Sequence, residues 1–486
     1  MEETLKQTTA KSMAWSAVNS GATQLLNLAL GIVLARLLTP SDYGIVGVLT
    51  VFTVMASNIQ AFGFAHALIN RKEDSRADYN AVFWFNVAVG LALYAILYAC
   101  APLIARFFHQ PCLTEVSRVL FLVFVIMSFG TTYNGYLTKH LMNRRIAIVS
   151  VTALAVSGAV GILMAWRGMS YWSLVYQQLT YATLLTAGRC LSCPRLLSLR
   201  VSLAPIKQMM GFGVRIMFTN IATTLSNHAL TFIIGRLFPI HDVGNYSQAN
   251  KWNIMASTTI YSIADQVVQP VMVRANADAE RRKRVFRKLM RLTAFFAFPA
   301  MLGLSLVSHE FIVVTIGEKW LDAVALLRIL CVAGAVVPLH HVYQNFIAST
   351  GRSDIYLYTN LSLIAAEVAV VLAVSSLGIQ AMVTAFVAVV VLWTAVWHLV
   401  SRRAVNYSVR ELASDTLRYL LAAVAVLALT WAVTLPIDNL PLRLVTRVAI
   451  AAACYGGAMW LLRDDIFSDL LEFLKKGRGG QSAQSK

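Results

Sequence analysis

Charged residues are scarce in this chain. Of its 486 residues, 13% are Asp, Glu, Lys or Arg, whereas 58% are hydrophobic. A soluble domain carries about 25% charged residues, so the composition excludes an ordinary water-soluble fold. Acidic residues are scarcer than basic residues: the chain has 23 Asp and Glu and 41 Lys and Arg. The net charge of +18 does not indicate nucleic-acid binding, because the basic residues lie in short loops between apolar runs.

Cysteines are few, and motifs of catalysis or metal binding are missing. The six cysteines are scattered, and Cys190 and Cys193 form a lone CxxC pair, whereas a structural zinc site needs four ligands. We interpret them as free thiols in a reducing compartment. The sequence has no phosphate-binding loop, nucleophile elbow or metalloenzyme signature. We therefore expect no enzyme activity, no metal, no cofactor and no ATP hydrolysis by this chain.

Apolar runs recur from end to end. Their length of roughly 20 residues is what crosses the hydrocarbon core as a helix. They predict an all-α polytopic membrane protein of about fourteen transmembrane helices. The expected helices are centred near residues 24, 54, 92, 127, 156, 179, 224, 259, 300, 334, 366, 389, 425 and 452. The segment Met1–Lys11 is polar and precedes a run long enough to span, so we expect no cleavable signal peptide.

Basic residues gather in loops on one side of the expected membrane. This predicts cytoplasmic N- and C-termini, with residues 476–486 as a disordered cytoplasmic tail. The densest basic run is Arg281–Arg291. Two interpretations of that run stay open: it sets the topology, or it also contacts anionic lipid headgroups.

An internal repeat organises the chain: the stretch Ala22–Ser57 returns 200 positions later. Apolar composition cannot explain why polar residues recur with it. The repeat predicts two six-helix lobes, at 1–200 and 201–405, related by a pseudo-twofold axis along the membrane normal. Two further helices follow at 406–475. The matches include Thr23 with Thr223, Asn27 with Asn227, Arg36 with Arg236, Asp42 with Asp242, and Gly44 with Gly244.

Polar side chains line one face of the first expected helix and of its repeat. Ser16, Thr23 and Asn27 recur at helical spacing, and Thr223 and Asn227 do so in the second copy. These stripes either line a central hydrophilic cavity or hydrogen-bond packed helices to one another. For the paired stripes as a set we favour the cavity, and hence a role in substrate binding.

Charges within the membrane are costly and mark functional positions. Arg215, Lys251 and Asp265 fall inside expected spans, and the equivalent first-half positions are uncharged. We infer that an anionic group of the substrate is held mainly by Arg215 and Lys251. The alternative is that Arg215 reaches the interface and Lys251 pairs with Asp265.

Asp265 is also a candidate for coupling or gating, and two further groups are candidates with it. Glu367 lies mid-span, where a carboxylate carries a coupling proton or cation, or is paired with a neighbour. The second group is the recurring Arg36, Asp42, Arg236 and Asp242. Thr39 and Pro40 before Asp42 are typical of a helix start. We therefore interpret the four recurring residues as corner residues, that is, as structural residues of the turn between two consecutive helices. The alternative is that they form an ion pair that gates transport.

Several segments resemble the polysaccharide flippases (Wzx-type) of the multidrug/oligosaccharidyl-lipid/polysaccharide (MOP) superfamily. The resemblance extends over most of the chain and is strongest to the branch of colanic acid and teichuronic acid exporters. The segments that carry it are Ala35–Gly44, Phe62–Ala65 with Arg71 and Lys72, Phe83–Asn86, Gly317–Trp320 and Thr350–Arg352.

The resemblance implies a substrate and a mechanism. The substrate would be an undecaprenyl-pyrophosphate-linked oligosaccharide, flipped across a bacterial inner membrane by alternating access for lipopolysaccharide, capsule or exopolysaccharide export. Cavity arginines and lysines contact pyrophosphate or acidic sugars in such proteins, which fits Arg215 and Lys251. The partners would be membrane lipids and the polysaccharide assembly machinery, with the protein itself a monomer. In related peptidoglycan-lipid flippases, two extra helices form a groove for the lipid tail.

Three alternatives remain. A cation-coupled multidrug antiporter on the same scaffold would need acidic cavity residues, and this chain offers more cations. A membrane polysaccharide polymerase or ligase would need a sizeable outer loop with catalytic residues. A non-transporting scaffold for the assembly machinery would leave the intramembrane charges unexplained.

Overall fold

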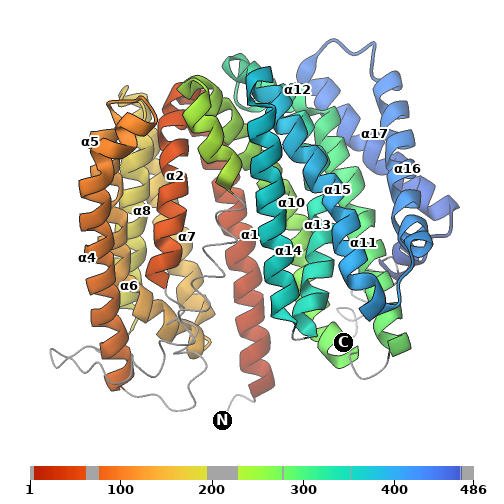
Figure 1. Ribbon diagram of the computed structural model, residues 1–486, viewed down its shortest axis with the longest axis horizontal. Coiled ribbons are helices and arrows are strands. Elements are labelled where there is room, and N and C mark those ends of the chain that lie inside the picture. The colour runs from red at the N-terminus through yellow and green to blue at the C-terminus, as the bar shows by residue number, and fades with distance from the viewer. Residues whose placement is uncertain are drawn as a thin grey trace, which may run out of the picture. The chain divides into compact units, whose positions relative to one another are not determined.

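Helices form nearly all of the chain that the structure, a computed structural model, describes (Figure 1). The described residues are 5–61, 76–193, 228–275, 279–350, 352–470 and 472. No strand occurs among them. By contacts, the chain divides into two compact units, Met1–Gly244 and Asn245–Lys486. The lobe boundaries expected from the repeat stay a prediction.

The first unit is a bundle of membrane-length helices. The principal packing pairs are α7 with α8, α1 with α7, α4 with α6, and α6 with α8. A helix over His228–Leu237 and the first turn of α10 complete the unit. Its labelled helices are α1 (Leu5–Leu37), α2 (Pro40–Ala61), α4 (Arg76–Phe107), α5 (Leu113–Leu120), α6 (Leu122–Lys139), α7 (Asn143–Trp166) and α8 (Trp172–Leu191).

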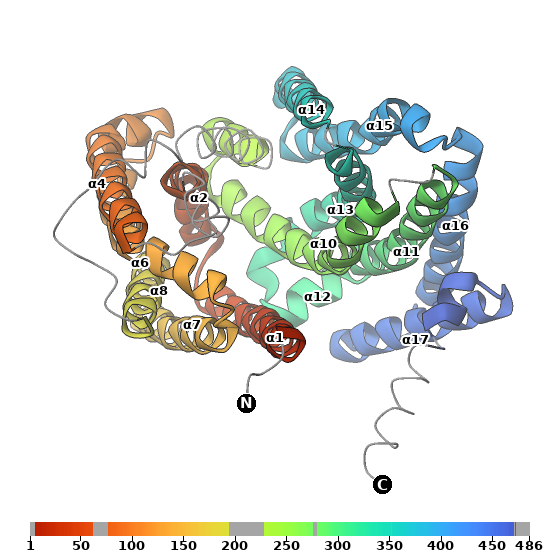
Figure 2. The ribbon, with the colours of Figure 1, turned by 90° about the horizontal axis from the view of Figure 1, so that it is seen from below.

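The second unit repeats that pattern and then extends it. A long helix, an eight-residue helix and three further helices pair as α11 with α13, α13 with α15, and α14 with α15. α16 then packs on α11 and on α17 (Figure 2). The helices are α10 (Ile240–Ala275), α11 (Ala279–Leu306), α12 (Ser308–Thr315), η1 (Glu318–Trp320), α13 (Leu321–Ser349), α14 (Ser353–Ala373), η2 (Ser375–Leu377), α15 (Ile379–Val405), α16 (Val409–Val433) and α17 (Leu440–Leu461).

Local signals fix where the last helices begin. At α16, the Ser408 hydroxyl accepts from the Glu411 backbone N–H, and the Glu411 carboxylate accepts from the Ser408 N–H. This is a capping box. At α17, the Asn439 side chain accepts from the Leu442 N–H, and Pro441 occupies the first turn, where no N–H is needed.

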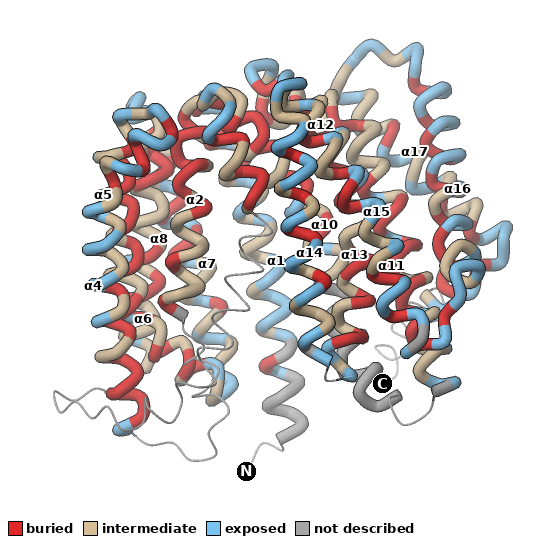
Figure 3. Tube along the Cα trace, viewed as in Figure 1, coloured by how far each residue is buried: buried red, intermediate tan, exposed pale blue. Residues whose placement is uncertain are grey.

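Eleven helices in the described residues are long and apolar enough to cross a membrane. They coincide with eleven of the expected spans, and two further expected centres fall on α8 and α10. The remaining centre, near residue 224, lies outside the described residues. Buried residues collect where helices of one unit face each other (Figure 3). Large apolar side chains such as Leu421 and Val445 are about two-thirds exposed, at 64% and 65%, which suits contact with lipid.

Candidate functional site

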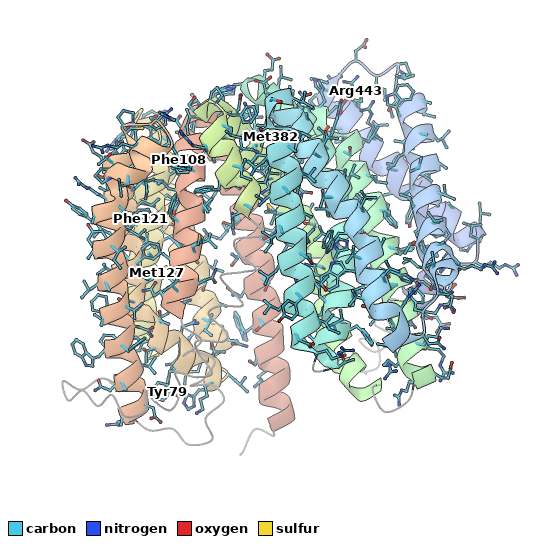
Figure 4. The ribbon with its side chains drawn as sticks, viewed as in Figure 1. Tyr79, Phe108, Phe121, Met127, Met382 and Arg443 are labelled. Carbon is cyan, nitrogen blue, oxygen red and sulfur yellow. The ribbon has the colours of Figure 1, made fainter. Side chains whose placement is uncertain are left out.

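A polar cavity lies inside the first unit. Its volume is about 390 Å³, and its walls come from α1, α2, α6, α7 and α8. Thr23 and Asn27, predicted from the stripe on the first helix, both line it. Met127 of α6, labelled in Figure 4, supplies part of the apolar wall. This cavity belongs to one unit, and the expected cavity between lobes stays a prediction.

Ser16, in the same stripe, has a different role. The Asn143 amide nitrogen donates to Ser16 Oγ at 2.8 Å and to Ser12 Oγ at 2.6 Å. These bonds join the start of α7 to α1. The stripe therefore divides: its first turns bind helix to helix, and Thr23 and Asn27 face the cavity.

The corner between α1 and α2 is held by Asp42. Its Oδ2 accepts from the backbone N–H of Thr39 at 2.8 Å and from the Thr39 hydroxyl at 2.7 Å. Ser170, before α8, donates to Oδ1. Asp42 is 6% exposed, and these contacts support the corner interpretation of this residue.

The second copy cannot build the same cap. Pro239 stands where Thr39 stands in the first copy, and proline has neither the N–H nor the hydroxyl that Asp42 uses. The Asp242 side chain is instead 34% exposed, with His241 Nδ1 at 3.5 Å from its Oδ1. The corner is thus conserved in sequence spacing but not in hydrogen bonding.

Arg236 is an anchor within the first unit. Its Nη1 donates to the Phe107 carbonyl oxygen at 2.7 Å and contacts the His109 ring, and its guanidinium lies 5.0 Å from the Phe107 ring centroid. Arg36, its counterpart, is exposed in the last turn of α1. Phe108 packs beside this anchor against Phe232 (Figure 4).

The starts of α2 and α10 approach each other closely. A Cβ atom added at Gly44 would overlap the Ile240 carbonyl oxygen, and one added at Gly244 would overlap that of Pro40. Positions 40 and 240 are equivalent in the repeat, as are 44 and 244. The contact is therefore reciprocal, and only glycine lets the two backbones meet at this distance.

Lys251 lies on α10 and is half-buried, with its Nζ 5.6 Å from the Trp252 ring centroid. Asp265 is on the same helix, and the structure does not describe its side chain. Arg215, Thr223 and Asn227 lie outside the described residues. The proposed anion-binding role of Arg215 and Lys251 therefore stays a prediction.

Glu367 is buried at 5% exposure on α14. Its Oε2 atom has no hydrogen-bond partner among the described atoms. A charge in the membrane interior costs at least about 3 kcal/mol. The side chain therefore suits a carboxyl that takes up a proton or meets a cation, and its role in coupling stays a prediction.

The basic run Arg281–Arg291 has a role that sequence analysis did not assign. Arg287 donates two hydrogen bonds to Asp415 of α16, at 2.8 and 3.0 Å, and Arg291 donates a third at 2.6 Å. The Asp415 side chain is 0% exposed, and the Tyr407 hydroxyl also donates to it. This Asp415 cluster attaches α16 to α11.

A second ionic cluster lies at the opposite end of α11. The Glu310 side chain, on α12, is 3% exposed. Its Oε1 atom lies 2.8 Å from Arg443 Nε and 2.9 Å from Arg447 Nη1, and both arginines are on α17. Arg447 also donates to the Thr434 hydroxyl at 3.0 Å. Figure 4 labels Arg443 near the start of α17. We call this set the Glu310 cluster.

An apolar groove lies between the two clusters. Its volume is about 520 Å³, and α11, α12, α16 and α17 supply its walls. Arg447 is the one charged residue among the described residues of its lining, and the others are apolar, small or aromatic, including Gly303, Leu427 and Ala451. The last two helices thus form an apolar site with α11 and α12 of the same unit.

The lone CxxC pair packs against buried side chains of the first unit. Cys190 and Cys193 lie against the buried cluster of Phe83 and Tyr133. Burial, with a smaller contribution from Cys190, raises the pKa of the Cys193 thiol to about 11. A thiol that stays protonated is a poor nucleophile.

Sequence analysis missed most of the cavity lining. Gln177, Gln178 and Tyr181 reach it from α8, and Ser157 reaches it from α7. The one available signal was the pair of adjacent glutamines inside an otherwise apolar run. Asp415 was missed for a different reason: its partners lie 124 and 128 residues away in sequence.

The fold and these sites define a multi-pass membrane protein with a transporter-like scaffold. Residues 33–325 match the family described as "Polysaccharide biosynthesis protein". The match covers more than half of the chain, and the chain belongs to this family.

Three curated relatives have names that refer to polysaccharide biosynthesis. The lipopolysaccharide biosynthesis protein WzxC of Escherichia coli (strain K12) is 25% identical over 72% of each chain. The teichuronic acid biosynthesis protein TuaB of Bacillus subtilis (strain 168) is 24% identical over 96% of this chain and 97% of its own. The succinoglycan biosynthesis transport protein ExoT of Rhizobium meliloti (strain 1021) is 22% identical over 72% of this chain and 71% of its own.

Two solved structures share the fold. The lipid II flippase MurJ has a TM-score of 0.70 at 11% identity, covering 94% of this chain and 100% of its own. A multidrug resistance transporter (MATE family) of the MOP superfamily has a TM-score of 0.67 at 15% identity, covering 79% of this chain and 94% of its own.

Proposed function

We propose that this protein flips a lipid-linked oligosaccharide from the inner to the outer leaflet of a bacterial inner membrane. The lipid carrier is undecaprenyl pyrophosphate, and the exported sugar serves lipopolysaccharide, capsule or exopolysaccharide synthesis. The protein acts as a monomer with cytoplasmic termini, by alternating access of two six-helix lobes among fourteen spans. Family membership and the names of the relatives support a polysaccharide precursor as the substrate. The fold shared with MurJ is compatible with flipping.

The apolar groove carries the proposal. A lipid-linked sugar has a long hydrocarbon tail. The tail stays within the membrane while the sugar crosses, so it needs a matching apolar surface beside the protein. The groove offers such a surface along α11, α16 and α17. The two ionic clusters hold its walls together from both ends.

Two other observations favour flipping over multidrug antiport. The flippase structure matches a larger share of this chain, 94%, than the multidrug transporter, at 79%. An antiporter for cations would also use acidic groups in its cavity. The lining of the first unit's cavity, as far as the structure describes it, contains no acidic residue.

Lipid analysis of a deletion strain tests the function. Cells that lack the protein should accumulate a prenyl-pyrophosphate oligosaccharide, measured by mass spectrometry of a lipid extract, and complementation should remove it. An unchanged lipid pool together with increased sensitivity to cationic drugs would instead favour the antiporter.

Two glycine variants test the groove. Gly303→Leu should fill the groove, because Gly303 lines it and a Cβ there meets its nearest atom, in Leu427, only at 3.9 Å. Gly456→Leu is the matched control on α17, where a Cβ meets nothing within 4 Å. We expect the lipid to accumulate with Gly303→Leu and not with Gly456→Leu. Equal export by both variants, at equal protein levels, would remove the groove from the substrate path.

A further inference from the structure

The cavity of the first unit is lined by polar groups that carry no charge. Hydroxyl and amide side chains make up two-thirds of the lining, and no charged residue is present in it among the described residues. The polar set is Thr23, Asn27, Thr53, Ser57, Ser157, Gln177, Gln178 and Tyr181.

Three hydroxyls of this lining are already oriented by the helices that carry them. Thr53 donates to the Leu49 carbonyl oxygen at 2.9 Å, and Ser57 donates to the Thr53 carbonyl oxygen at 2.8 Å. Ser157 donates to the Leu154 carbonyl oxygen at 3.1 Å. Each proton is therefore used, and each oxygen keeps lone pairs that can accept from a ligand.

The amides supply the complementary donors. The side chains of Asn27, Gln177 and Gln178 have no protein hydrogen bond among the described residues. Gln177 packs closely against Gly161 of α7, because a Cβ atom added at Gly161 would lie 3.0 Å from the Gln177 Cβ atom. Polar groups at membrane depth need partners, so this cavity requires a ligand or water that both donates and accepts.

The chemistry and size of the cavity select among ligands. An anionic ligand such as pyrophosphate would need a Lys or Arg side chain beside it, and a cationic ligand would need a carboxylate. The described lining contains neither kind of side chain. A sugar ring carries hydroxyls that donate and accept at once, and its C–H faces suit the apolar walls of Val123 and Met127. The volume of 390 Å³ lies near the lower limit of small-molecule pockets, about 300–1,000 Å³.

We propose that this cavity is a subsite for one uncharged sugar residue. It rests on the proposed function only in naming the lipid-linked oligosaccharide as the source of that sugar. The charged pyrophosphate then binds elsewhere in the protein, and the first unit binds the sugar. Because a site built to hydrogen-bond hydroxyls discriminates strongly against analogues that lack them, this subsite sets which repeat unit is accepted.

Sugar binding to the purified full-length protein tests the subsite. The probes are D-glucose, D-galactose and N-acetyl-D-glucosamine, with D-glucuronate as the charged comparison, measured by saturation-transfer NMR on protein in lipid nanodiscs. We expect binding of at least one neutral sugar. Asn27→Leu and Gln178→Met should each weaken it roughly 2- to 10-fold, the value of one lost hydrogen bond.

Controls separate the subsite from folding and from the flippase proposal. Thr183→Val, on α8 outside the cavity lining, should bind like the wild type, and all variants should elute and melt like it. No neutral-sugar signal, tighter binding of glucuronate, or binding unaffected by both cavity variants would overturn the subsite. Lipid accumulation in the deletion strain without sugar binding would leave the flippase and refute the subsite, and the reverse result would refute the flippase alone.

Discussion

Removing the charge of Asp415 should detach α16 from α11. In Asp415→Asn the two guanidinium groups of Arg287 and Arg291 lose their fully buried partner. Breaking such a buried ionic contact from one side costs about 3–5 kcal/mol. Arg287 keeps Glu411 at 3.2 Å and Arg291 keeps Asp465 at 3.7 Å. We therefore expect the lower limit, about 3 kcal/mol.

The thermal midpoint of the purified protein in detergent measures this loss. For a unit of this size, 1 kcal/mol shifts the midpoint by roughly 2–4 °C, so Asp415→Asn should melt about 6–12 °C below the wild type. Asp469→Asn is the matched control, because its pair with Lys288 joins side chains that are 55% and 65% exposed. Exposed pairs contribute about 0–1 kcal/mol. If both variants melted at the same temperature, buried ion pairing would not be what attaches α16.

Three further predictions concern the helix contact and the two membrane charges. Gly44→Ala and Gly244→Ala should each destabilise the first unit by about 1–3 kcal/mol through overpacking, seen as a lower melting midpoint, and the argument fails if either is neutral. Glu367→Gln should leave stability nearly unchanged and make export insensitive to a protonophore, whereas wild-type sensitivity would exclude a coupling proton at this position. Lys251→Ala should lower export about 10-fold or more, the value of a hydrogen bond to a charged group, with insertion intact. Wild-type export at equal protein level would remove Lys251 from the substrate path.

The sequence predicts the helices better than the sites. Runs of about 20 apolar residues locate membrane helices, and the eleven observed spans lie on expected centres. Thr39, Pro40 and Asp42 also predict the start of α2, because a helix cap is a local interaction and its hydrogen bonds appear as expected.

Sites that depend on packing could not be predicted. Thr23 and Gln178 share a cavity although most of the first unit separates them in sequence. Asp415 and Arg287 are 128 residues apart. Periodicity gives the face of a helix on which a residue lies, but not the neighbour that face meets. The run Arg281–Arg291 illustrates this, because a basic loop and a helix-binding surface have the same composition.

The reciprocal contact between α2 and α10 has an evolutionary consequence. In a symmetric homodimer, residue i of one subunit contacts residue j of the other, and j contacts i in return. Positions 40 and 44 show this relation with 244 and 240 inside a single polypeptide. Fusion of two copies of a half-length chain would produce such a relation, and in the resulting single chain the two sides can differ. Position 40 is Pro and position 240 is Ile, whereas positions 44 and 244 are both Gly, because neither side has room for a methyl group.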